Sequence, residues 1–157
     1  LMRHHGTDPT RFLDYVHEID LTGVPADPIL DTALGRLPGR KLVFTNGSAA
    51  HADRVLGRLG IARHFEAVVD IVASDYVPKP EPAAYDRLVE RFSIDPARAV
   101  MVEDIAANLE PAHKLGMTTV WLRHADDWAH KHPDHQFIDH VITDLPAWLA
   151  ELTAVEV

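Results

Sequence analysis

The chain has 157 residues, 46% of them hydrophobic and 25% charged, which is typical of one globular domain with a sizeable core and argues against disorder. The formal net charge of -9 argues against a nucleic-acid partner, because phosphate backbones are bound by a surplus of Lys and Arg. There is no cysteine, so disulfides and thiol chemistry are excluded. No apolar run approaches about 20 residues and no secretory signal is visible, so we expect no membrane span and a cytoplasmic location.

Residues 1–38 carry only helical signals. Asp8-Pro9 and Asp27-Pro28 each place a capping residue before a proline at the first helical position. Apolar side chains then recur at helical spacing, at Phe12, Leu13, Val16 and Ile19 in the first segment and at Leu30, Ala33, Leu34 and Leu37 in the second. We therefore expect residues 1–38 to form a different structural unit from residues 39–157.

Residues 39–157 alternate between strand and helix patterns. Strands are predicted at 41–45, 67–71, 99–102, 118–122 and 140–142, of which those at 41–45 and 99–102 are expected to be buried. Helices are predicted at 49–59, from 82 to about 92, from about 105 to 115, and at 145–152. A polar loop is predicted at 124–138. This alternation indicates an α/β fold with a mostly parallel sheet, helices on both faces and right-handed crossovers.

Unusual polar residues follow the first of these strands. In Thr45-Asn46-Gly47-Ser48, the Thr45 hydroxyl, the following N–H groups and the start of a helix are suited to hold a phosphate oxygen. The alternative is an ordinary strand end followed by a Ser48 helix cap.

Lys79 lies between Pro78 and Pro80, which stiffen the backbone on both sides. An ammonium held there can neutralise a phosphate and a nearby carboxylate. The alternative is a solvated surface lysine.

Glu103 and Asp104 follow the apolar strand at 99–102. Two adjacent acids at the mouth of a buried strand are costly unless they are paired or bind a metal, and oxygen ligands of this kind suit Mg2+. The alternative is a helix start with Asp104 as its N-cap.

The order of these three features resembles the haloacid dehalogenase superfamily of phosphohydrolases. Thr45 matches the second motif of that superfamily, Lys79 the third, and Glu103-Asp104 the fourth. The resemblance covers residues 39–145. Within the superfamily the chain looks like the pyrimidine 5′-nucleotidase group, on the segments 44–47 and 75–80 and on Glu103-Asp104 with Asn108, where many members carry an acid. Residues 8–22 resemble the end of that group's helical cap domain.

The resemblance implies a Rossmann-like core at 39–157, a cap remnant at 1–38 and a Mg2+-dependent phosphomonoester hydrolase that forms a phospho-aspartyl intermediate. The expected substrate is a small phosphorylated molecule, most specifically a pyrimidine nucleotide. It further implies that Thr45, Asn46 and Gly47 bind the phosphate. Lys79 would orient the nucleophile, and Asp104 with Glu103 would hold the metal, directly or through water.

One part of the family pattern is missing. The nucleophile belongs to an Asp-x-Asp motif on the central first strand, and the nearest candidate, 17–22, has Glu18 in its place and no preceding strand. The missing strand would lie between the strands at 41–45 and 99–102. We therefore expect that the natural protein continues upstream of Leu1, that this chain alone is inactive, and that its unpaired strands allow self-association.

Other functions stay open at this stage. They are a sugar-phosphate phosphatase, a haloacid dehalogenase, and a non-catalytic domain that binds phosphate or a partner. The late histidines at 124, 130, 132, 135 and 140 could bind a transition metal, but no common zinc spacing supports this, and a polar loop is the simpler reading.

Overall fold

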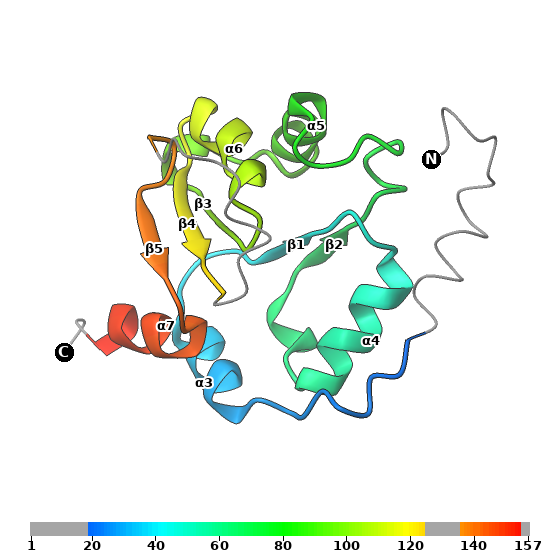
Figure 1. The fold of residues 1–157 in the computed structure, drawn as a ribbon, viewed down its shortest axis with the longest axis vertical. Coiled ribbons are helices and arrows are strands. Elements are labelled where there is room, and N and C mark those ends of the chain that lie inside the picture. Colours follow the sequence, from blue (N-terminus) through cyan, green and yellow to red (C-terminus); the bar gives the residue numbers. More distant parts are fainter. Residues whose placement is uncertain (1–18, 125–135, 155–157) are drawn as a thin grey trace. The chain divides into compact units, whose positions relative to one another are not determined.

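The computed structural model describes residues 19–124 and 136–154 (Figure 1). The chain divides into two compact units, 1–73 and 74–157, which are considered one at a time below. The helix predicted from Asp8 lies outside the described residues, apart from Ile19, which is not helical. None of the helices in the described part is long and apolar enough to cross a membrane.

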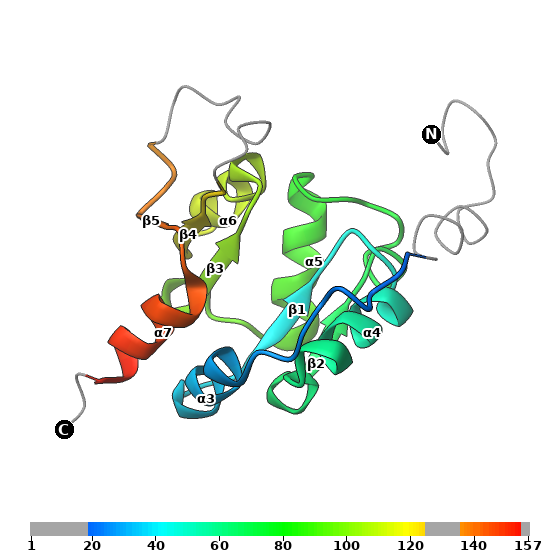
Figure 2. The same cartoon turned by 60° about the horizontal axis from the view of Figure 1, so that its bottom comes forward.

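The first unit contains helix α3 (Pro28–Arg36), strand β1 (Leu42–Phe44), helix α4 (Ala49–Leu59) and strand β2 (Ala67–Val69). The Asp27 side chain caps α3 as predicted, accepting from the N–H groups of Ile29 and Leu30. β1 and β2 pair in parallel, with Leu42 opposite Ala67 and Phe44 opposite Val69. α4 packs against β2 (Figure 2).

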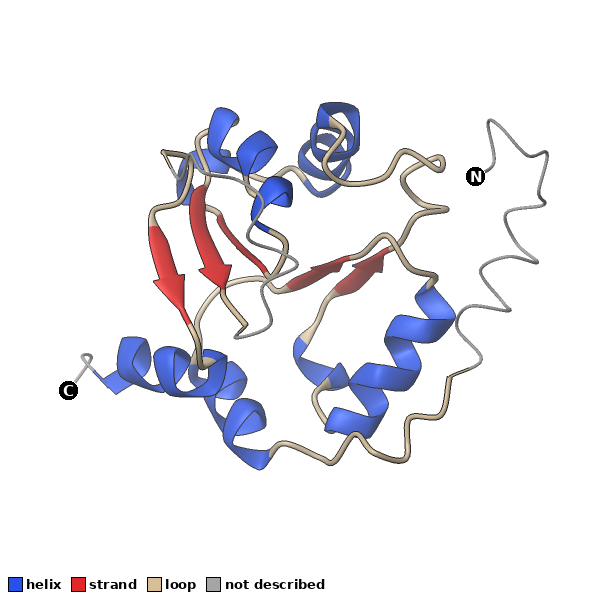
Figure 3. Ribbon diagram, in the orientation of Figure 1, coloured by secondary structure: helices blue, strands red, loops and turns tan. Residues whose placement is uncertain are grey.

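The second unit contains α5 (Pro82–Phe92), β3 (Val100–Glu103), α6 (Glu110–Lys114), β4 (Thr118–Leu122), β5 (His140–Ile142) and α7 (Leu145–Ala154). Its strands form a parallel sheet in the order β3-β4-β5 (Figure 3). The core includes the fully buried side chains of Tyr85, Leu109, Thr119 and Val120. The α/β class with parallel strands is thus confirmed.

Two predictions of secondary structure are wrong in detail. The single helix expected up to residue 115 is a 3-10 turn at Ala106–Asn108 followed by the short α6. Pro111 accounts for the break, because it has no N–H to continue an earlier helix and instead fits the first turn of a new one. The strand expected at 67–71 ends at Val69, because the chain turns after Asp70.

The prediction that β1 and β3 are buried is also wrong. All three residues of β1 are only half-buried, and on β3 Val100 and Val102 remain 57% and 37% exposed. The described strands form two separate sheets, in which β1 pairs only with β2 and β3 only with β4. Each of these two strands therefore has an edge with no strand partner among the described residues, and the side chains near it stay accessible.

Candidate functional site

The turn after β1 joins that strand to α4. The Gly47 N–H donates to the Thr45 hydroxyl oxygen at 3.0 Å, and the His51 N–H donates to the Ser48 hydroxyl at 3.3 Å. Ser48 is therefore the N-cap of α4, as its alternative reading predicted. Asn46 is exposed and Thr45 and Gly47 are half-buried, so this turn lies at the surface of its unit, at the carboxyl end of a parallel strand. That is where ligands bind in folds of this class.

Asp70, at the carboxyl end of β2, is a polar residue that the sequence analysis did not single out. The residue is 8% exposed, and its two side-chain oxygens accept from the N–H groups of Ala49 at 2.9 Å and Ala73 at 2.8 Å. An acid directly after the apolar run at 67–69 was the available signal.

In the second unit, Lys79 is paired with Glu103. The Lys79 ammonium donates to Glu103 Oε2 at 2.5 Å, and the two side chains are only 9% and 7% exposed. The alternative of a solvated surface lysine is therefore wrong. The structure brings together two predicted site residues that are 24 positions apart in the sequence.

Both carboxylate oxygens of Glu103 are engaged. While Oε2 binds Lys79, Oε1 accepts from the N–H groups of Asp104 at 3.2 Å and Ile105 at 3.3 Å. Burial raises the pKa of Glu103 above its usual range, and the adjacent ammonium opposes that rise. Because Glu103 has a cation at 2.5 Å and two N–H donors, we describe Glu103 as a carboxylate and Lys79 as an ammonium.

Asp104 is exposed and does not cap the helical turn that follows, so the N-cap alternative is wrong. The interaction with the neighbouring Glu103 side chain holds the pKa of Asp104 below its usual range, and the Lys79 charge contributes in the same direction. The backbone of Asp104 is fixed from β4, because the buried Trp121 donates from its indole N–H to the Asp104 carbonyl at 3.0 Å.

The Asn108 segment, next along the chain, is held from α5. The Tyr85 hydroxyl donates to the Asn108 carbonyl at 2.5 Å, and both residues are buried. Burial, with a smaller effect of the Glu103 charge, strongly raises the pKa of Tyr85, so its hydroxyl stays a donor. Tyr85 is a further residue of this site that the sequence did not single out.

The donors for a metal are oxygen atoms of the kind that Mg2+ prefers, but they are few. Within residues 19–124 and 136–154 there is no group of three His, Cys, Asp or Glu side chains arranged to hold a metal ion. Asp104 offers an exposed carboxylate, whereas the oxygens of Glu103 are already bound. The histidines at 130, 132 and 135 lie outside the described residues, so the predicted loop cluster has no structural test.

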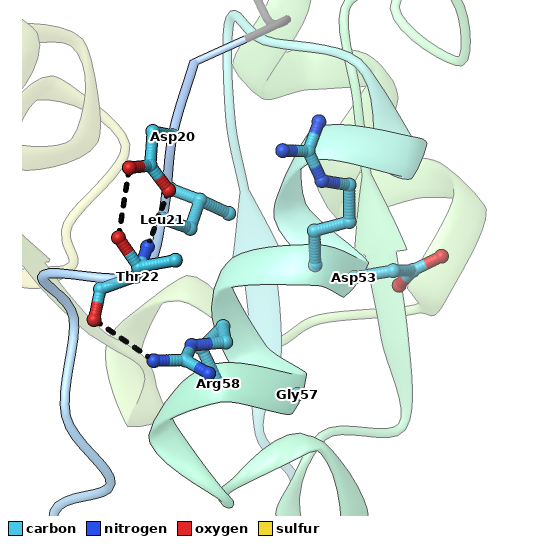
Figure 4. Close-up of a pocket in the computed structure, with 7 residues that line it drawn as sticks. Asp20, Leu21, Thr22, Asp53, Gly57 and Arg58 are labelled. Atoms are coloured by element: carbon cyan, nitrogen blue, oxygen red, sulfur yellow. Dashed lines mark hydrogen bonds between the residues drawn. The ribbon is translucent and has the colours of Figure 1, made fainter.

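Residues 19–22 do not form the missing first motif. They are not in a strand, and both Asp20 oxygens accept from Thr22, one from its N–H and one from its hydroxyl, each at 2.8 Å. Residues 20–22 and side chains of α4 line a hollow of about 350 Å³ (Figure 4). Arg54 and Arg58 there donate to the carbonyls of Ile19 and Thr22. None of the predicted phosphate-site residues lines this hollow.

Comparison with known proteins gives concordant findings. Residues 6–116 match the haloacid dehalogenase-like hydrolase family. The chain is 30% identical over 117 residues to a glyceraldehyde 3-phosphate phosphatase of Pyrococcus furiosus, covering 70% of this chain and 46% of that protein. It is 31% identical over 113 residues to the fructose-1-phosphate phosphatase YqaB of Escherichia coli, covering 69% and 57%. The chain thus spans about half the length of these curated relatives.

Solved structures share the fold. A HAD phosphatase from Thermococcus onnurineus superposes with a TM-score of 0.61 at 22% identity, over 95% of this chain and 64% of that chain. An L-2-haloacid dehalogenase from Xanthobacter autotrophicus superposes with a TM-score of 0.62 at 18% identity, over 79% and 59%. At these identities the likeness shows the fold alone.

Proposed function

This chain belongs to the haloacid dehalogenase-like hydrolase family, and from that premise we propose that the protein carrying it is a Mg2+-dependent phosphomonoester hydrolase. The observation that carries the proposal is the buried Lys79–Glu103 pair beside the exposed carboxylate of Asp104, at the carboxyl end of β3. A buried ammonium held by a carboxylate is expensive to build, and at a strand end it is suited to meet a phosphate group.

Each predicted residue receives a role in this proposal. Thr45, Asn46 and Gly47 bind the phosphate oxygens through the turn after β1. Lys79 offsets negative charge on the transferred group, and Glu103 keeps its ammonium in place. Asp104 would hold Mg2+, with Glu103 contributing through water. When bound, the metal would supply positive charge that stabilises the phosphoryl oxygens.

The nucleophile is assigned to a segment outside this chain. The resemblance calls for an Asp-x-Asp motif on a strand, and residues 19–22 do not supply one. The resemblance implies such a strand between β1 and β3, and each of these strands has an edge with no strand partner among the described residues. In this proposal the first aspartate attacks phosphorus and the second acts as acid and base. The chain on its own is then inactive, and its free strand edges favour self-association.

Two substrate classes follow from different observations. The similarity of 44–47 and 75–80 to the pyrimidine 5′-nucleotidase group favours a pyrimidine nucleoside monophosphate. The names of the relatives from Pyrococcus furiosus and Escherichia coli favour a small sugar phosphate. Both classes carry a phosphomonoester group, so the proposed roles in binding phosphate and metal apply to substrates of either class.

Phosphate release by the full-length protein tests the proposal. The panel contains pyrimidine monophosphates, fructose 1-phosphate and glyceraldehyde 3-phosphate, each with Mg2+ and with EDTA. At least tenfold higher kcat/KM on a pyrimidine monophosphate supports the nucleotidase, and the reverse supports the sugar-phosphate phosphatase. Asp104→Asn should remove the response to Mg2+, while Asp53→Asn, an exposed change on α4, should keep it. Absence of phosphate release from every ester would reject the function.

A further inference from the structure

We infer that Asp70 is a positioning residue of the phosphate-binding turn: its buried carboxylate fixes the end of the turn at α4 and leaves Thr45–Gly47 as the place where phosphate binds. This inference rests on the proposed function, because it assigns a role within the same phosphate-binding turn.

The burial of Asp70 requires an explanation. It follows Val69 and precedes Ile71, which are 2% and 5% exposed, and it is itself 8% exposed. A carboxylate so placed is costly unless hydrogen bonds replace its lost hydration. Asp70 meets that requirement with one N–H donor on each oxygen, from Ala49 at 2.9 Å and from Ala73 at 2.8 Å.

These two bonds connect separate parts of the first unit. Ala49 is the first residue of α4, directly after the Ser48 cap, so one oxygen ties the end of β2 to the start of that helix. Ala73 lies three residues beyond Asp70, so the other oxygen fixes the bend by which the chain leaves β2. A single side chain therefore sets both the helix start and the neighbouring turn.

Main-chain bonds hold the remainder of the phosphate-binding turn. The Thr45 N–H donates to the Val69 carbonyl at 2.9 Å, and the Ile71 N–H donates to the Gly47 carbonyl at 3.2 Å. With the Asp70–Ala49 bond, the turn from Thr45 to Ala49 is attached to the end of β2 at its beginning, middle and end. Of these three attachments, only the one through Asp70 uses a side chain and can be removed by substitution.

The charge of Asp70 also bears on where an anion binds. The start of a helix attracts negative charge through its N–H groups and its dipole. In α4 that position already has the Asp70 carboxylate on the Ala49 N–H. A phosphate is therefore directed away from the helix start, toward Thr45, Asn46 and Gly47. Asp70 thus has two effects, holding the turn in shape and restricting where the ligand binds.

The test compares Asp70→Ala and Asp70→Asn with the control Asp53→Asn in the full-length protein. Each variant is assayed for KM and kcat on the best phosphomonoester, Ki for inorganic phosphate, and hydrogen exchange of the Ala49 amide. Loss of both bonds in Asp70→Ala should raise KM and Ki by about tenfold or more, given that small displacements of binding groups can cost a hundredfold. The change in kcat should be less than threefold, and exchange at Ala49 should accelerate.

Asp70→Asn keeps one acceptor oxygen and should raise KM and Ki by a smaller factor than Asp70→Ala. If Asp70→Ala does not fold, Asp70→Asn alone tests the inference. The control should stay within twofold of wild type. A folded Asp70 variant with wild-type KM and Ki, or with only kcat reduced, would overturn the inference. A wild-type protein that neither binds phosphate nor releases it would overturn the proposed function as well, so the two failures are distinguishable.

Discussion

Neutralising one partner of the Lys79–Glu103 pair should destabilise the fold strongly. Lys79→Met leaves a buried carboxylate without its cation, and Glu103→Gln leaves a buried ammonium without its anion. In Glu103→Gln the single amide oxygen still accepts from the N–H groups of Asp104 and Ile105, which donate to Glu103 Oε1 in the wild type. The substitution therefore removes charge while it keeps the local backbone bonds.

The magnitude follows from burial. Both side chains are less than a tenth exposed and their charged atoms are 2.5 Å apart, so water cannot compensate the remaining charge. Breaking such a buried pair costs about 3–5 kcal/mol, whereas removing both charges at once costs much less. The double variant should therefore be at least as stable as either single variant, with an interaction energy above about 2 kcal/mol.

Urea unfolding of the 157-residue chain, followed by circular dichroism at pH 7, measures these free energies. The control is Lys114→Met, which breaks the Lys114–Glu110 pair. That pair has a similar distance of 2.7 Å, but its side chains are 68% and 43% exposed. The control should change stability by no more than about 0.5 kcal/mol. Single variants that lose less than about 1 kcal/mol, or effects that simply add in the double variant, would refute the reasoning.

Two further predictions concern groups outside this pair. A hydrogen bond from His64, with a smaller effect of Arg63, lowers the pKa of Asp31 in the folded chain. The ionised Asp31 therefore stabilises the fold at pH values above the pKa that Asp31 has in the unfolded chain, and this stabilisation is lost as pH falls below about 4. Asp31→Asn should therefore flatten the acid side of the plot of Tm against pH. An equal fall of Tm at low pH in the wild type and in Asp31→Asn would contradict this. Trp121→Phe removes the donor to the Asp104 carbonyl and should cost about 1–3 kcal/mol in the same urea assay, and unchanged stability would show that the bond is not needed.

Local signals made much of the fold predictable. α4 begins and ends where the sequence places it, because Ser48 supplies a side-chain cap and Gly60 adopts a φ of +77° that favours glycine at a helix end. β4 and β5 also have their predicted bounds. The segment after Asp104 was predicted as one continuous helix, because Pro111 can interrupt a helix or start one and the sequence does not say which.

The site was predictable in its residues but not in its contacts. Lys79, Glu103 and Asp104 stand out because charged groups follow stiff or apolar segments. Their pairing is a long-range contact, and two adjacent acids offer no sign of which one meets the lysine. Asp70 was missed because an acid after a short strand is common on surfaces, and only the parallel pairing of β1 and β2 brings it to the start of α4.

The most direct test of the central claim is the kcat/KM of full-length Lys79→Ala on a phosphomonoester with Mg2+, compared with wild type and Lys114→Ala. If Lys79 offsets charge on the transferred phosphoryl group, its loss should reduce kcat/KM by about a hundredfold or more, close to 2.7 kcal/mol of transition-state stabilisation, while Lys114→Ala stays at the wild-type value. A folded Lys79→Ala protein with kcat/KM within twofold of wild type would contradict the assignment of a phosphate-handling site to this chain.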